Sequence, residues 1–116
     1  MLDVDNRAVY LVVEPDPLLR ADLTEALQDG DTQANVIAVS NVQYALERMT
    51  TVQVLCLALV AASPMGFATS ALAKTIAEKG GQVVLMGGRA EALGEAAGYR
   101  VLQRPFSQIH ITAMLV

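Results

Sequence analysis

The chain has 116 residues and a net charge of −4; 53% of its residues are hydrophobic and only 17% are charged. This length fits one domain, residues 1–116, and so apolar a chain favours a sheet that is covered on both faces. Lys and Arg form no cluster, so a direct nucleic-acid partner is not expected. No apolar run reaches the roughly 20 residues that span a bilayer. The N-terminus lacks a signal-peptide pattern, and the single cysteine allows no internal disulfide, so we expect a cytoplasmic protein without a membrane partner.

Short aliphatic runs alternate along the chain with segments in which apolar residues recur at helical spacing. The predicted strands are 8–13, 36–39, 52–59, 83–86 and 99–102. The helices that follow them are predicted to begin at residues 17, 42, 67, 89 and 108, the third ending at 79 and the fourth at 97. Asp16, Ser40 and Ser107 are the expected N-caps of the first, second and last helix.

This alternation predicts an α/β fold in which a (βα)5 chain is doubly wound around a five-stranded parallel sheet, as in flavodoxin-like proteins. In such sheets, functional groups gather at the carboxyl ends of the strands, near the point where the strand order reverses. The residues at those ends are 14–16, 58–60, 87–88 and 104–105. We therefore look for a site among them.

At these places the chain resembles the receiver domain of bacterial response regulators. Residues 12–20 look like that family's first strand and acidic turn, and 103–107 look like its last turn, in which a basic residue precedes Pro-Phe. Residues 64–67 resemble the glycine turn after the third strand. The landmarks follow in the family's order at matching spacing over nearly the whole chain. The resemblance implies a receiver-type fold, a two-component or phosphorelay pathway, and a cis peptide between Arg104 and Pro105.

The resemblance also implies a phosphorylation site, and here the sequence departs from the family. In receivers, acidic residues hold Mg²⁺, an aspartate takes the phosphoryl group, and a Ser or Thr and a Lys bind its oxygens. In this chain a proline, an alanine, a glycine and an arginine replace four of these groups. Without the acceptor carboxylate the covalent chemistry is lost, so we expect neither an enzyme nor a bound metal or cofactor. The vestigial pocket would comprise Glu14, Pro15, Asp16, Ala58 in place of the acceptor, Gly87 in place of the hydroxyl residue, and Arg104 in place of the lysine.

Structural roles compete with functional ones at several positions. Asp16 is the expected cap of a helix, and Glu14 is expected to form an ion pair with Arg104 rather than to bind a metal. An unpaired Arg104 would instead bind an anion. Cys56 is expected to be buried and inert, and His110 to lie at or near the surface without a catalytic partner.

The end of the chain is predicted to carry a partner surface. In related receivers the fourth helix, fifth strand and fifth helix form the usual dimer or partner face, and the last helix here is more apolar than one buried stripe requires. We expect Val101, Ile109, Ile111 and Met114 to contact a histidine kinase, an output protein or a second copy in a homodimer. Ordinary packing of this helix on the sheet is an equal alternative.

Three functions are compatible with the residues. The first is a non-catalytic, receiver-like signalling module that acts through protein–protein contact and is not phosphorylated on aspartate. The second is an atypical response regulator that is phosphorylated at a non-standard site, with Asp16 as a candidate. The third is a small-ligand sensor that uses the vacated pocket. Collapse of the loops onto Ala58 would argue against the third.

Overall fold

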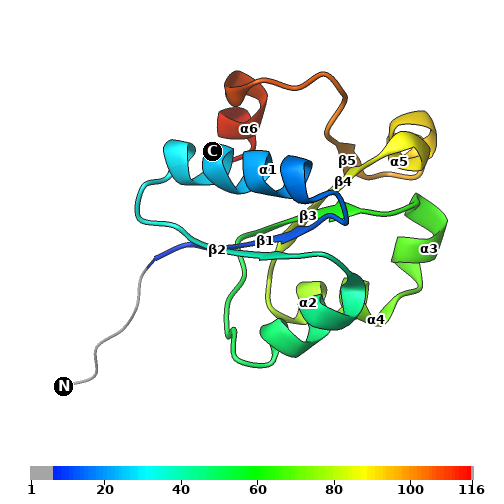
Figure 1. Ribbon diagram of the computed structural model, residues 1–116. Helices are drawn as coiled ribbons and strands as arrows, with labels where there is room; N and C mark the ends of the chain where they lie inside the picture. The colour runs from blue at the N-terminus through cyan, green and yellow to red at the C-terminus, as the bar shows by residue number, and fades with distance from the viewer. Residues whose placement is uncertain (1–6, 116) are drawn as a thin grey trace.

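The computed structural model describes residues 7–115, which form one five-stranded parallel sheet between helical layers (Figure 1). The strands lie in the order β2-β1-β3-β4-β5, as in flavodoxin-like sheets. Their bounds are β1 (Val9–Val13), β2 (Asn35–Val39), β3 (Leu57–Ala61), β4 (Gln82–Met86) and β5 (Arg100–Val101). The helices are α1 (Pro17–Gly30), α2 (Val42–Met49), α3 (Pro64–Ala68), α4 (Ala71–Glu78), α5 (Gly88–Leu93) and α6 (Gln108–Met114). The predicted doubly wound parallel sheet is confirmed.

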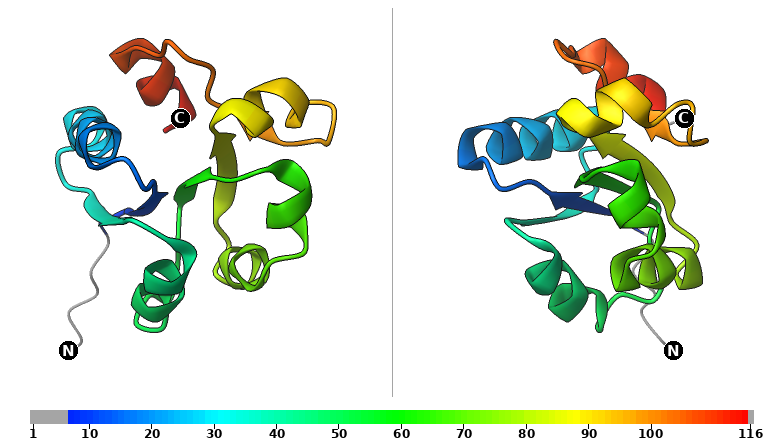
Figure 2. Two further views of the ribbon diagram at one scale, coloured as in Figure 1. Left: turned by 45° about the vertical axis from the view of Figure 1, so that its right-hand side comes forward. Right: turned by 90° about the vertical axis from the view of Figure 1, so that its right-hand side faces the viewer.

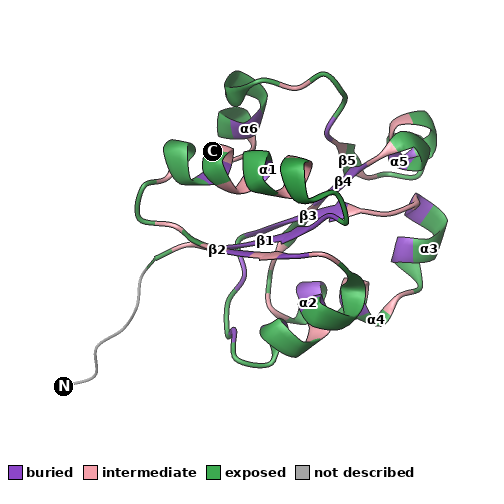
Figure 3. Cartoon of the chain, viewed as in Figure 1, coloured by how far each residue is buried: buried purple, intermediate pink, exposed green. Residues whose placement is uncertain are grey.

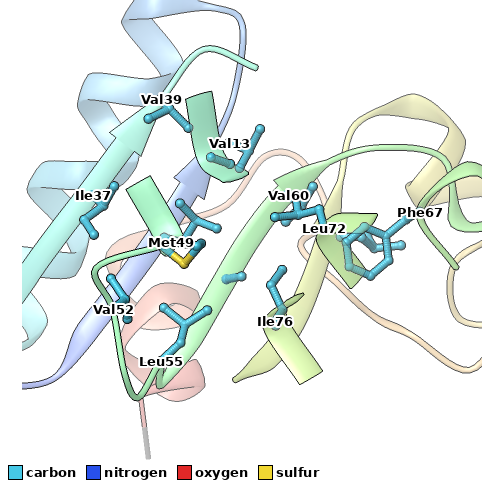
Figure 4. Packing of buried hydrophobic residues seen from close by; sticks show 14 of the residues in the cluster. Val13, Ile37, Val39, Met49, Val52, Leu55, Val60, Phe67, Leu72 and Ile76 are labelled. Atoms are coloured by element: carbon cyan, nitrogen blue, oxygen red, sulfur yellow. The ribbon is translucent and has the colours of Figure 1, made fainter. Parts of the chain in front are cut away.

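Each strand contributes to two hydrophobic cores, because successive side chains point to opposite faces of the sheet. On one face, Leu11 and Val13 of β1 belong to the core that α2 and α4 cover (Figure 4). On the other face, Val12 packs with Leu23 of α1 and Ile111 of α6. The burial colours of Figure 3 show the same arrangement, with buried strands inside and exposed outer faces on the helices.

Hydroxyl and carboxylate caps set the starts of several helices. The Asp16 side chain accepts hydrogen bonds from the first turn of α1, as predicted. Ser63 caps α3 and Ser70 caps α4, so the single helix predicted over 67–79 is two short helices. The cap of α2 is Asn41 and not Ser40, because the Asn41 side chain accepts from the backbone N–H of Tyr44 at 2.9 Å.

The third strand is shorter than predicted and starts later. Residues 52–56 precede β3, although Val52 and Leu55 are buried at the base of the core. Both residues are hydrogen-bonded to Lys79, which lies outside the sheet. Lys79 Nζ donates to the Val52 carbonyl at 2.6 Å, and the Leu55 N–H donates to the Lys79 carbonyl. Apolar periodicity reports burial, and here burial extends beyond the strand.

Because all five strands are parallel, their carboxyl ends lie at one edge of the sheet. This edge is on the right in Figure 1 and faces the viewer in the right-hand panel of Figure 2. α3 and α5 start from it and contact each other. Within residues 7–115, no helix is both long enough and apolar enough to cross a membrane.

Candidate functional site

The acidic turn after β1 is closed by its own hydrogen bonds. Glu14 is buried, and its Oε2 accepts from the Asp16 N–H at 3.0 Å. Asp16 Oδ1 accepts from the N–H groups of Leu18 and Leu19 at 2.9 and 3.4 Å. Arg20 Nη1 donates to the Glu14 carbonyl at 2.8 Å. The turn thus commits its two carboxylates to its own backbone, and the predicted capping role of Asp16 is confirmed.

Ala58 does not lie where the sequence resemblance placed it. It is the second residue of β3, pairs with Leu11 in the middle of the sheet, and has no exposed surface. The last residue of β3 is Ala61, one position beyond the pair Val13–Val60, and the register therefore brings it level with Glu14. The prediction was wrong because the strand was expected to end at residue 59, whereas β3 runs from Leu57 to Ala61. Residues 57–63 hold no carboxylate in either register.

Gly87 follows β4 at the same edge, and its backbone conformation favours glycine. Its φ is +102°, a value that side chains with a Cβ rarely adopt, and it is the N-cap residue of α5. The position that carries a serine or threonine in receivers therefore has a backbone conformation here that favours glycine. A serine or threonine here would be strained in this turn.

Arg104 is paired with Glu91 of α5 and not with Glu14, so the predicted ion pair is wrong. Arg104 Nε and Nη2 donate to the two carboxylate oxygens of Glu91 at 2.9 and 2.8 Å, and the Arg104 backbone N–H adds a third bond at 2.9 Å. Hydrogen bonds from Arg104 lower the pKa of Glu91 to about 2. The same bonds raise the pKa of Arg104, and Glu14 adds a smaller attraction through space. The peptide between Arg104 and Pro105 is cis, as the resemblance implied.

These residues do not fit the Mg²⁺ ion that receivers hold at this edge. A hard cation needs several oxygen ligands, and the two carboxylates of the turn already accept backbone hydrogen bonds. Pro15 and Ala61 offer no side-chain oxygen at all. Among residues 7–115, no three carboxylate, imidazole or thiol groups come together as a metal site would require. We derive no step through a metal here.

The four residues predicted to form a partner surface at the end of the chain do not lie on one surface. Ile111 is buried against α1 and the sheet, so its assignment to a surface was wrong. Val101 and Met114 line a groove of about 520 Å³ between β5 and α6. Ile109 is 79% exposed but does not line that groove. The stripe at 111, 114 and 115 faces the sheet and α1, which leaves Ile109 as the exposed member of the set.

The predicted exposure is wrong for Cys56 and confirmed for His110. Cys56 is exposed, against prediction, because it precedes β3 and faces a groove at the amino edge while Val52 and Leu55 fill the core beside it. His110 is exposed, as predicted, and it also takes part in the N-terminal capping of α6, because its Nδ1 accepts the Ser107 N–H at 2.9 Å. A histidine three residues after a capping serine could have signalled this role.

Sequence reasoning missed Glu91 and Arg20, both of which hold the carboxyl edge together. Glu91 lies 13 positions before Arg104 and only the tertiary fold brings them into contact. Arg20 lies within one turn of the acidic loop, and its position in the first turn of α1 was a usable signal. The predicted vestigial pocket does not assemble as expected, since Ala58 is fully buried in mid-strand and Arg104 is paired with Glu91.

No protein-family model matches the chain, and no curated protein matches it either. Solved structures do. A response regulator from Thermotoga maritima matches with a TM-score of 0.64 and 15% identity, over 94% of this chain and 98% of that one. A protein from Burkholderia pseudomallei described as related to pilus assembly matches with a TM-score of 0.62 and 15% identity, over 100% of this chain and 97% of that one. At this identity the likeness shows the fold: the chain has the flavodoxin-like fold of receiver domains.

Proposed function

Starting from this receiver-type fold, we propose that the protein is a non-catalytic signalling module that acts through protein–protein contact and is not phosphorylated on aspartate. The observation that carries the proposal is the composition of the carboxyl edge. No carboxylate stands at the end of β3, a glycine with positive φ follows β4, and Arg104 is engaged by Glu91. Phosphoryl transfer needs an acceptor and positioned charge; here the end of β3 lacks the acceptor, and the charge of Arg104 is paired with Glu91.

The alternative of a non-standard phosphorylation site is disfavoured by the same contacts. Asp16 is exposed, but its Oδ1 caps α1, and the neighbouring Glu14 carboxylate is buried and already accepts the Asp16 N–H. A phosphoryl group on Asp16 would cost the cap, which is worth about 1 kcal/mol. A partner could come from a two-component pathway or, given the second structural neighbour, from a pilus assembly apparatus.

The test is intact-mass spectrometry after incubation with Mg²⁺ and acetyl phosphate, with an active receiver domain as the positive control. We expect no phosphoryl adduct on this chain while the control is modified. A hydroxylamine-labile adduct would refute the proposal, and Asp16→Asn would then show whether Asp16 is the acceptor.

A further inference from the structure

Residues of α3 and α5 line a groove of about 700 Å³. Figure 2 shows these two helices beside the carboxyl edge of the sheet, and they contact each other. Pro64, Met65 and Ala68 of α3 form one wall. Leu93 of α5 and Ala97 of the following turn form the other. The groove belongs neither to the vestigial pocket nor to the face formed by β5 and α6.

The lining of this groove is unusually apolar for a surface. Met65 is 84% exposed, the highest value among the large hydrophobic side chains of the described residues, and Leu93 is 51% exposed. Isolated exposed apolar side chains are common, but two of them in one groove with further apolar neighbours indicate an interaction site.

Helical spacing explains why α5 presents this face. Arg89 and Leu93 are four residues apart in α5, so both lie on one side of the helix and line the groove, and Ala97 of the following turn lines it as well. Ala90 and Gly94 lie on the opposite side and are buried. A Cβ at Gly94, the residue that follows α5, would clash with the side chain of Val101, so the end of α5 lies close against β5.

The groove is also held in place before anything binds. The bidentate pair of Glu91 with Arg104 ties α5 to the loop that leads to α6. Phe67 of α3 and Tyr99 before β5 pack edge to face, with ring centroids 5.8 Å apart, and Tyr99 forms part of the groove lining. A preformed wall spares a ligand the entropy cost of ordering it.

Arg89 is the one charged residue among those that line the groove. It is exposed, and within residues 7–115 no ion pair or hydrogen bond engages its guanidinium. A guanidinium beside apolar side chains suits a carboxylate, which it binds through two donors. The charge of the groove is therefore complementary to an acidic ligand.

We propose that this groove binds a helix of a partner protein whose apolar stripe is flanked by a glutamate or aspartate, with the carboxylate on Arg89. The proposal rests on the proposed function and names its contact surface. A helix fits better than a strand, because α3 and α5 bond their backbones internally and offer no sheet edge to extend.

The experiment uses the full ¹⁵N-labelled chain and two helical peptides with leucines at positions i, i+4 and i+7. One peptide carries a glutamate next to the stripe and the other a lysine at the same place. We expect amide shifts confined to residues 64–69 and 89–99, and an affinity on the order of tenfold higher for the glutamate peptide, the scale of a close interfacial charge pair. Arg89→Glu should reverse the preference, while Arg48→Glu, on the exposed surface of α2, should leave it unchanged.

Equal affinity for both peptides, shifts centred on β5 and α6, or no shifts at millimolar peptide would overturn the inference. So would self-association that Leu93→Ser abolishes in sedimentation velocity, because the occupant would then be a second copy. Circular dichroism verifies that each variant is folded. If the chain takes no phosphoryl group but fails these peptide tests, the proposed function stands and only this binding surface is refuted. A phosphoryl adduct would refute the proposed function itself.

Discussion

Replacing Ala58 with aspartate, the change that would restore an acceptor if the resemblance gave the correct register, should instead strongly destabilise the protein. Ala58 has no exposed surface and lies opposite Leu11 inside the core that α2 and α4 cover. A carboxyl group there must be protonated, and holding an aspartic acid of ordinary pKa near 3.9 neutral at pH 7 costs about 4 kcal/mol. The added atoms in a closely packed strand cost about 1–3 kcal/mol more. This approaches the whole stability of an ordinary domain, about 5–15 kcal/mol.

The assay is urea unfolding followed by circular dichroism, with Ala61→Asp as the matched control. Ala61 lies at the end of β3 and is partly exposed, so we expect a loss of at most about 2 kcal/mol there. Because the penalty at position 58 comes from an unfavourable charge, lowering the pH from 7 to 4 should return up to about 4 kcal/mol to Ala58→Asp. If both variants were equally stable at pH 7, position 58 would face solvent and the strand register described here would be wrong.

Three further predictions concern titration and reactivity. Burial and the hydrogen bond to Asp31 raise the pKa of Tyr10 to about 12, so Tyr10 should ionise late in an ultraviolet titration. That late step should vanish in Tyr10→Phe, and the associated stability, fully present below pH 10, should be lost as the pH rises toward 12; a late step that persists in Tyr10→Phe would contradict this. The lowered pKa of Glu91 contributes stability above pH 4.5 that is lost as the pH falls toward 2. In Glu91→Gln the urea midpoint should therefore depend less on pH across that window. The same pH dependence in the variant as in the wild type would argue against the ion pair. Exposed Cys56 should react fully with a thiol reagent in the native state, and protection until urea is added would show that it is buried.

Local patterns in the sequence predicted the alternation of strands and helices, the fold class and the starts of α1 and α6. Buried runs alternate with helical spacing, and Asp16 and Ser107 stand where caps are needed. The sequence also located the missing chemistry at the carboxyl edge: whichever residue ends the third strand, residues 57–63 contain no carboxylate.

The strand register and the partner of Arg104 depend instead on contacts between segments that are distant in the sequence. Ala58 falls in mid-strand and not at its end, since Val52 and Leu55 are buried before the strand begins and a run of apolar residues does not mark where pairing begins. Arg104 meets Glu91 and not Glu14, because the choice between two carboxylates depends on how α5 packs on β5. The groove between α3 and α5 joins residues some thirty positions apart, and only their packing places Arg89 beside Met65. The sequence pattern shows which side chains are apolar, while contacts between distant segments decide which of these side chains remain exposed.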